Sequence, residues 1–180
     1  MKVNIGKYPR HRWYHNFVFW HFGYEAKVKE KIVIEEFDTW SMDHTLAKII
    51  LPMLIQLKET KHGAPFVEME DVPELLRWDM KDERHYNTKG EVDEQYFERW
   101  EYVISEMIWA FEQKNSDDWT EQYTKGEHDI QWIELEDGMS EMTKGPNDTF
   151  ESDDEGIKAH QKRITNGFRL FGKYYEGLWD

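Results

Sequence analysis

The spacing of apolar residues alternates between two periods along the chain, and this alternation limits the fold more than any other feature. In KVKEKIVIEEF, residues 27–37, apolar side chains alternate with charged ones, the period of a strand with one buried face. From Asp43 to Lys58 the apolar residues recur every three or four positions, the period of a helix, in which Pro52 is expected to cause a kink. The apolar positions of this helix are Leu46, Ile49, Ile50, Met53, Leu54 and Leu57. Because they cover nearly every face, the helix is predicted to be central.

Two further helices and a hairpin are predicted downstream. The segment 92–113 has an apolar stripe at helical spacing, and Asp137-Gly138 between two alternating runs favours a tight hairpin turn. Ser152 and Glu155 have the spacing of a capping box before a long apolar stripe that reaches Leu178. The glycines of this last segment would destabilise a helix, so close packing against another element is expected at Gly167, Gly172 and Gly177. The sequence therefore predicts an α+β fold: a single domain over residues 1–180, with N-terminal strands and a β-hairpin packed with three main helices.

Composition excludes several classes of function. The chain has no cysteine, which removes disulfides, thiol nucleophiles and zinc–thiolate sites. It has no apolar stretch near the roughly 20 residues of a membrane-spanning helix, so we expect a soluble protein without a membrane partner. The formal charge of -14 comes mainly from acidic residues between positions 63 and 156, and this sign disfavours binding to duplex DNA. We expect neither a cofactor nor a metal site.

The stretch FDTWSMDHTLAKII, residues 37–50, gathers polar side chains where the predicted strand gives way to the helix. Two interpretations are open. Ser41 or Asp43 would cap the helix, with Trp40 covering its start. Alternatively the stretch is a ligand site, in which Asp38 and His44 form a carboxylate–imidazole pair. Further candidate ligand-binding residues are Lys61 and His62, which lie at the far end of the helix and would join this site only if a second subunit supplied them.

Two other segments carry residue types that bind phosphate groups or stack on bases. RHRWYHNFVFWHF, residues 10–22, interleaves Arg10 and Arg12 with aromatic residues. The alternative for this segment is an aromatic-rich edge strand with a basic solvent face. His160 and Arg163 lie on the polar side of the last helix, together with Lys158 and Asn166.

The blocks DTWSMDHTLA, KHGAP and KGPNDTF, with RWEYVISEMIWAFEQ before the last of them, resemble a family of uncharacterised proteins that tailed bacteriophages and environmental viruses encode. The resemblance covers about residues 36–180. It implies a phage origin and the cytoplasm of an infected bacterium as the place of action, or the virion if the protein is structural. No activity is established for that family, so the resemblance implies no mechanism.

Three classes of function follow from these features. The first is an accessory protein that binds a small phosphate-bearing ligand or a host protein during host takeover or defence evasion. The second is a virion structural or assembly component, for which the many tryptophans and tyrosines would supply contact surfaces. The third is a metal-dependent nucleotide hydrolase that uses Glu98 and Glu101, whose E-x-x-E spacing can place two carboxylates on one helix face. We expect binding and not catalysis, and the sequence leaves homo-oligomer formation open.

Overall fold

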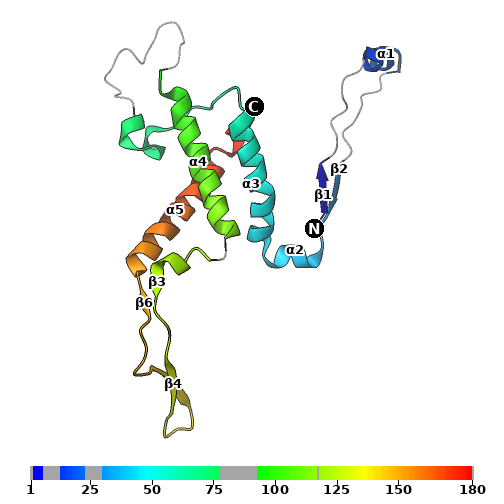
Figure 1. Ribbon diagram of the computed structural model, residues 1–180. Coiled ribbons are helices and arrows are strands. Elements are labelled where there is room, and N and C mark those ends of the chain that lie inside the picture. Colours follow the sequence, from blue (N-terminus) through cyan, green and yellow to red (C-terminus); the bar gives the residue numbers. More distant parts are fainter. Residues whose placement is uncertain (1, 6–12, 23–29, 78–92, 117, 180) are drawn as a thin grey trace. The chain divides into compact units, whose positions relative to one another are not determined.

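The computed structural model describes residues 2–5, 13–22, 30–77, 93–116 and 118–179. The fold is α+β, as predicted: N-terminal strands, a β-hairpin and three main helices are present (Figure 1). Contacts along the chain divide it into two compact units, residues 1–45 and 46–180, and each is described by itself. The prediction of a single domain stays a prediction. None of the described helices is long and apolar enough to cross a membrane.

The described residues of the N-terminal unit form a two-stranded antiparallel sheet and short helices. Strand β1 (Lys2–Ile5) pairs with β2 (Glu30–Val33), and helix α1 (Trp13–Phe22) lies between them in the sequence. The edge strand considered for residues 10–22 is therefore wrong for 13–22, and Arg10 and Arg12 lie outside the described residues. The strand predicted to reach Phe37 ends at Val33, because helix α2 (Glu36–Trp40) begins with a capping box between Glu35 and Asp38.

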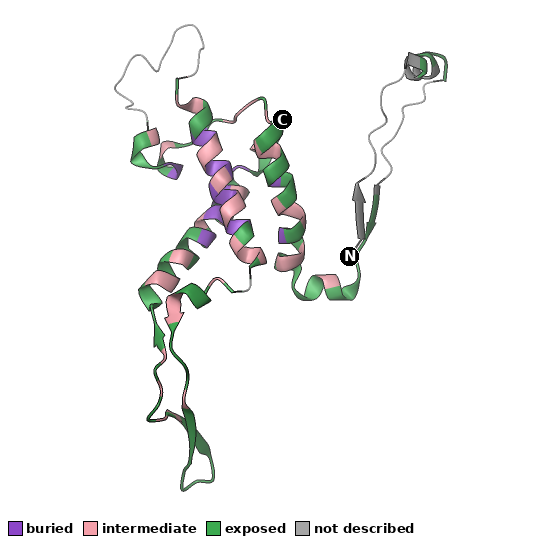
Figure 2. Cartoon of the chain, viewed as in Figure 1, coloured by how far each residue is buried: buried purple, intermediate pink, exposed green. Residues whose placement is uncertain are grey.

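The core of the second unit is built on two long helices, α4 (Tyr96–Asn115) and α5 (Asp154–Lys173). Helix α3 (Met42–Thr60), which begins in the first unit, adds Ala47 and Leu54 to this core, and Pro52 lies inside it. The predicted α4 stripe is confirmed, and Figure 2 shows buried residues gathered on α4 and α5. The buried cluster contains Ala47, Leu54, Val67, Val72, Trp100, Val103, Ile104, Met107, Phe111, Leu170 and Tyr174.

A glycine sets the distance between α4 and α5. A Cβ atom added to Gly167 would overlap the Ala110 methyl group and lie 2.7 Å from the Glu106 carbonyl oxygen. The close packing predicted for Gly167 is confirmed. Gly172 is different, since a Cβ there would meet no atom within 4 Å, so that part of the prediction is wrong. Gly177 lies beyond α5, in the short 3-10 helix η5 (Tyr175–Gly177), where a Cβ would lie 2.9 Å from the Pro65 ring.

The described residues after α3, 61–77, pack on the core through short turns. They include the 3-10 helices η1 (Met69–Asp71) and η2 (Glu74–Leu76), and Val67 and Val72 are buried. Two hydrogen bonds from α4 fix this segment: the Tyr96 hydroxyl group donates to the Ala64 carbonyl oxygen, and Arg99 donates to the Leu76 carbonyl oxygen. Arg99 is buried and also forms an ion pair with Asp93.

The segment between α4 and α5 forms two short antiparallel ladders. After the 3-10 helix η4 (Glu121–Tyr123), strand β3 (Thr124–Lys125) pairs with β6 (Glu151–Ser152). Farther out, β4 (Ile130–Glu134) pairs with β5 (Ser140–Lys144). The predicted hairpin turn is confirmed, with Gly138 at a φ of 80°.

The cap of α5 and the exposure of the hairpin strands differ from what the sequence pattern predicts. Asp153, and not Ser152, caps α5, because its carboxylate accepts a hydrogen bond from the Gly156 N–H group at 2.9 Å. All residues of β4 are exposed, and the cross-strand pair of Trp132 and Met142 is exposed as well. The alternating pattern of the hairpin thus does not mark a face buried on the helices.

The contact at Gly167 gives a testable prediction with a control in the same helix. Gly167→Ala should lower the free energy of unfolding by about 1–3 kcal/mol, because the added methyl group meets the α4 backbone and a packed core yields little. Gly172→Ala should raise it, by up to about 1 kcal/mol, since alanine favours the helix and space is open there. Urea unfolding followed by circular dichroism measures both. Equal effects of the two substitutions would contradict the close-packing account.

Candidate functional site

The residues around the junction of α2 and α3 include a capping contact of α2 and the first turn of α3. The Asp38 carboxylate accepts a hydrogen bond from the Glu35 backbone N–H group at 3.0 Å, which lowers the pKa of Asp38. The Ser41 carbonyl oxygen accepts from the Thr45 N–H group at 3.1 Å and so begins the hydrogen bonding of α3. Asp43 lies in the first turn of α3, where its charge suits the helix dipole. The structure thus gives Asp38 a capping contact that the sequence had not suggested.

Trp40 and His44 are the other two residues predicted for a site in this stretch. Trp40 ends α2 and is 87% exposed, so the expectation that it covers the helix start is wrong. His44 is partly buried in the first turns of α3. The Glu35–Asp38 contact explains the start of α2, while the capping of α3 by the Ser41 or Asp43 side chain and the ligand site both stay predictions.

At the far end of α3, two lysines bind one glutamate of α4. Lys61 Nζ lies 2.5 Å and Lys58 Nζ 3.1 Å from the two Glu101 carboxylate oxygens. Burial would raise the pKa of Glu101, but the hydrogen bonds from Lys61 and Lys58 outweigh it and the pKa is lowered. In the E-x-x-E pair, the negative charge of Glu101 is therefore balanced by Lys58 and Lys61, and Glu98 is exposed. His62, which follows Lys61 in the sequence, is exposed.

The structure brings His160 and Arg163 together, on one side of α5 facing α4. His160 Nδ1 lies 3.0 Å from the Tyr123 hydroxyl oxygen, and Nε2 lies 3.0 Å from Gln113 Oε1. The imidazole ring is stacked on Trp119 at 4.5 Å and contacts Trp109 at 4.9 Å between ring centroids. Burial and the nearby Arg163 lower the pKa of His160.

Arg163 is bound within the chain by a carboxylate and an aromatic ring. Its guanidinium group forms two hydrogen bonds with buried Glu106, at 2.9 and 2.6 Å, and its central carbon lies 3.9 Å from the Trp109 ring centroid. Paired, stacked and bidentate contacts of this kind are among the stronger polar interactions. The phosphate-binding residues predicted on α5 thus hold the helices together.

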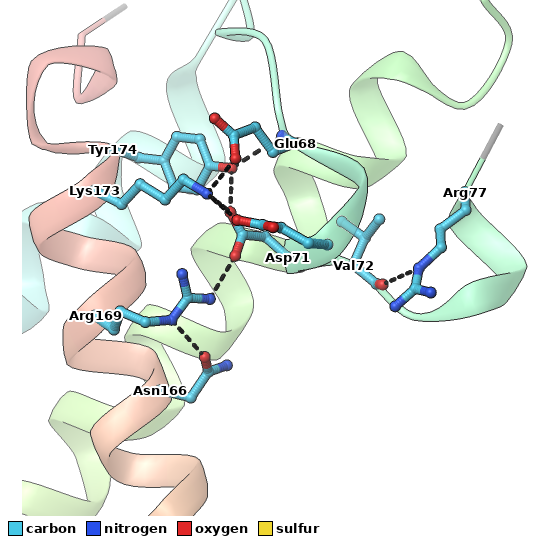
Figure 3. Close-up of polar contacts among 9 residues, drawn as sticks. Glu68, Asp71, Val72, Arg77, Asn166, Arg169, Lys173 and Tyr174 are labelled. Atoms are coloured by element: carbon cyan, nitrogen blue, oxygen red, sulfur yellow. Dashed lines mark hydrogen bonds and ion pairs between the residues drawn. The ribbon is translucent and has the colours of Figure 1, made fainter. Parts of the chain in front are cut away.

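A further polar cluster, shown in Figure 3, centres on buried Asp71. Its Oδ2 atom accepts from the Tyr174 hydroxyl group at 2.7 Å and lies 2.6 Å from Lys173 Nζ, while Oδ1 lies 2.5 Å from Arg169 Nη2. Burial alone would raise the pKa of Asp71, but the hydrogen bonds from Lys173, Tyr174 and Arg169 outweigh it and the pKa is lowered. Burial and the bond to Asp71 raise the pKa of Tyr174 to about 12.

Acidic side chains surround Lys173 in the same cluster. Its ammonium group lies 2.6 Å from a Glu68 oxygen and 3.0 Å from a Glu70 oxygen, in addition to Asp71. Oxygens of these three acids lie within 4.8 Å of one another, which is close enough to share a metal ion. The lysine ammonium group already contacts all three, so the geometry has the character of an internal salt bridge that fixes η1 to α5.

An apolar groove lies between α3 and the residues that follow α5. It has a volume of about 650 Å³. Met53 and Trp179, which line it from opposite sides, are 58% and 56% exposed. The lining consists of Ile50, Met53, Leu54, Gln56, Leu57, Thr60, Phe171, Tyr175, Leu178 and Trp179. Sequence reasoning missed the groove because it assigned every apolar face of α3 to the core.

The Asp71 cluster generates a stability prediction. Asp71→Asn should lower the free energy of unfolding by about 1.5–3 kcal/mol at neutral pH, because a buried carboxylate that accepts charged hydrogen bonds is lost. Since the folded pKa of Asp71 is lowered, its contribution is present above the unfolded value and is lost as pH falls through the folded value.

Chemical unfolding at about pH 7 and at about pH 3 measures this prediction. The variant and the wild type should differ less at the lower pH. Glu70→Gln is the control, because this exposed partner of the same lysine should contribute little. An Asp71→Asn variant as stable as wild type at neutral pH would show that the cluster does not hold η1 on α5.

Comparison of the chain with protein-family models, curated proteins and solved structures gives no match. The candidate functional features of the described residues are the groove beside α3 and the polar clusters around Glu101, Glu106 and Asp71.

Proposed function

We propose that the chain is a bacteriophage accessory protein that acts by binding a host protein, with the apolar groove beside α3 as its binding surface. The phage origin is supported by the resemblance of the DTWSMDHTLA, KHGAP and KGPNDTF blocks. The binding role is supported by one observation above all: a groove of about 650 Å³ with large apolar side chains exposed along it. Concave, mostly apolar surfaces with a few polar groups are typical of binding sites.

The lining favours the apolar face of a partner helix as the occupant. Along α3, Ile50, Met53, Leu54 and Leu57 repeat at positions i, i+3, i+4 and i+7, so they form one stripe about two turns long. Gln56 and Thr60, one turn apart, add hydrogen-bonding groups to the lining. Covering the exposed halves of side chains such as Met53 and Trp179 would contribute on the order of 1 kcal/mol each. A groove of this kind matches the helix-in-groove mode of recognition.

The phosphate-bearing ligand has weaker support. Lys61 binds Glu101, Arg163 binds Glu106, and His160 is bonded at both ring nitrogens. A phosphate group would have to displace these internal partners before it could bind. A protein partner in the groove requires no such displacement, and for that reason we prefer it. The hydrolase hypothesis stays untested, and the lysine pair on Glu101 does not favour it.

A virion role is the second candidate, because the N-terminal unit exposes several large aromatic side chains. Trp20 on α1 and Phe37 on α2 are 86% and 85% exposed, in addition to Trp40. Large aromatic side chains are enriched among residues that dominate protein interfaces, and an assembly protein needs broad contact surfaces.

The groove predicts a selective loss of binding. Met53→Glu should abolish specific capture of the host partner, because a charge would be buried against apolar side chains. Leu75→Glu is the matched control, since Leu75 is more exposed than Met53 and lies outside the groove lining. Affinity capture from host lysate identifies the partner, and calorimetric titration of the purified partner against all three proteins measures the dissociation constants. Equal affinity of wild type and Met53→Glu would reject the groove as the binding surface.

The second candidate predicts a different outcome. If the chain is an assembly component, purified phage particles should contain it in stoichiometric amounts, and a Trp20→Ala, Trp40→Ala double variant should be depleted from them. Quantitative mass spectrometry of particles measures this. Particles without the chain would reject the virion role and leave the accessory role standing.

A further inference from the structure

His160 lies where three elements meet in the second unit. The ring belongs to α5, its Nε2 atom faces Gln113 of α4, and its Nδ1 atom faces Tyr123 of η4. Trp119, just before η4, is stacked on the ring, and Trp109 of α4 contacts it at a tilt. The Asp153 N–H group donates to the Tyr123 carbonyl oxygen at 2.8 Å, so the same tyrosine also holds the end of β6. His160 therefore joins the base of the hairpin segment to both long helices.

A neutral imidazole satisfies these contacts in one tautomer. Gln113 Oε1 is an acceptor, so Nε2 carries the proton and donates it. Nδ1 then has a free lone pair, which accepts the Tyr123 hydroxyl proton. If Nδ1 gains a proton, it becomes a donor, and Tyr123 must rotate its hydroxyl proton toward another acceptor. Protonation thus reverses the bond to η4, in which the Tyr123 oxygen then accepts from Nδ1, and leaves the bond to α4 in place, so the cost of protonation comes from burying the new charge.

The charges around the ring oppose protonation. From its own helix, Arg163 acts on His160 as a neighbouring positive charge. From α4, the carboxylate Glu106 is bound through both oxygens to Arg163, and Gln113 and Trp109 are uncharged. From the segment 118–123, the Tyr123 hydroxyl group contacts the ring. The lowered pKa of His160 agrees with this arrangement, in which burial is the larger cause.

We propose that His160 is a proton-sensitive clasp: its neutral ring holds residues 118–125, and with them the base of the hairpin, on the α4–α5 pair, and acid releases that segment. The direction follows from linkage, because the folded state binds the proton less tightly than the unfolded or released state. The clasp is fully closed above the ordinary histidine pKa of 6.5 and opens as pH falls through the lower folded value. Carboxylates remain ionised over most of this range, so the effect belongs to histidine.

Hydrogen–deuterium exchange of the full chain at about pH 7.5 and about pH 5 tests the clasp, with rates corrected for the intrinsic effect of pH. Wild-type peptides that cover 118–125 should lose protection at the lower pH by about threefold or more, while α4 peptides stay protected. His160→Gln removes the titrating group, so its protection in 118–125 should be low and equal at both pH values. His128→Gln is the control, because His128 is an exposed histidine of the hairpin segment stacked on Phe150. It should keep the wild-type response.

Two results would overturn the proposal: wild-type protection that is equal at both pH values, or a fall in protection that persists unchanged in His160→Gln. If His160→Gln fails to fold, nuclear magnetic resonance titration of the wild type decides the question. The His160 resonances should show the Nε2-protonated tautomer and a midpoint below 6.5. A midpoint at or above that value would reject the clasp.

Discussion

The close approach of α4 and α5 at Gly167 is the constraint on which the second unit depends. With no side chain at that position, the backbone at Glu106 and the methyl group of Ala110 lie directly against α5. The contacts on either side run in opposite directions along the two helices: His160 meets Gln113, and Tyr174 meets Trp100. The helices are thus antiparallel, and the contact at Gly167 fixes the register in which Glu106 meets Arg163 and Gln113 meets His160. A longer spacing between α4 and α5 would separate these partners.

The basic residues of α5 pair with buried carboxylates of the same chain. Glu106 and Asp71 are buried carboxylates, which would destabilise the fold strongly if they were unpaired. Arg163 and Arg169 neutralise them from α5, so the basic residues of the last helix serve the fold. A cationic residue on a polar helix face has the same sequence signature whether its partner is a ligand or another part of the chain. That ambiguity is the physical reason why His160 and Arg163 looked like ligand residues in the sequence.

Local patterns predicted the elements that depend on local physics. Helical periodicity located α3, α4 and α5, and the Asp137-Gly138 turn located the hairpin. The pattern failed at α2, where the Glu35–Asp38 capping box ends an apparent strand. It could not reveal the Asp71–Tyr174 bond, because the two residues are 103 positions apart and nothing local to either one encodes the other. The groove was equally hidden, since periodicity shows which faces of α3 are apolar but not which of them the fold leaves uncovered.

The ladder of β4 and β5 is a candidate starting point for aggregation, because both strands are exposed at an edge. Strands β4 and β5 pair with each other, and each has a second edge whose backbone groups are available for pairing with another chain. Glu134 and Glu141 are exposed on these strands beside apolar residues such as Trp132. Their like charges repel the same strands of other molecules, and charged residues commonly protect sheet edges in this way. Strong acid or concentrated salt would weaken that repulsion, and the ladder would then be the place where ordered aggregates of this protein begin.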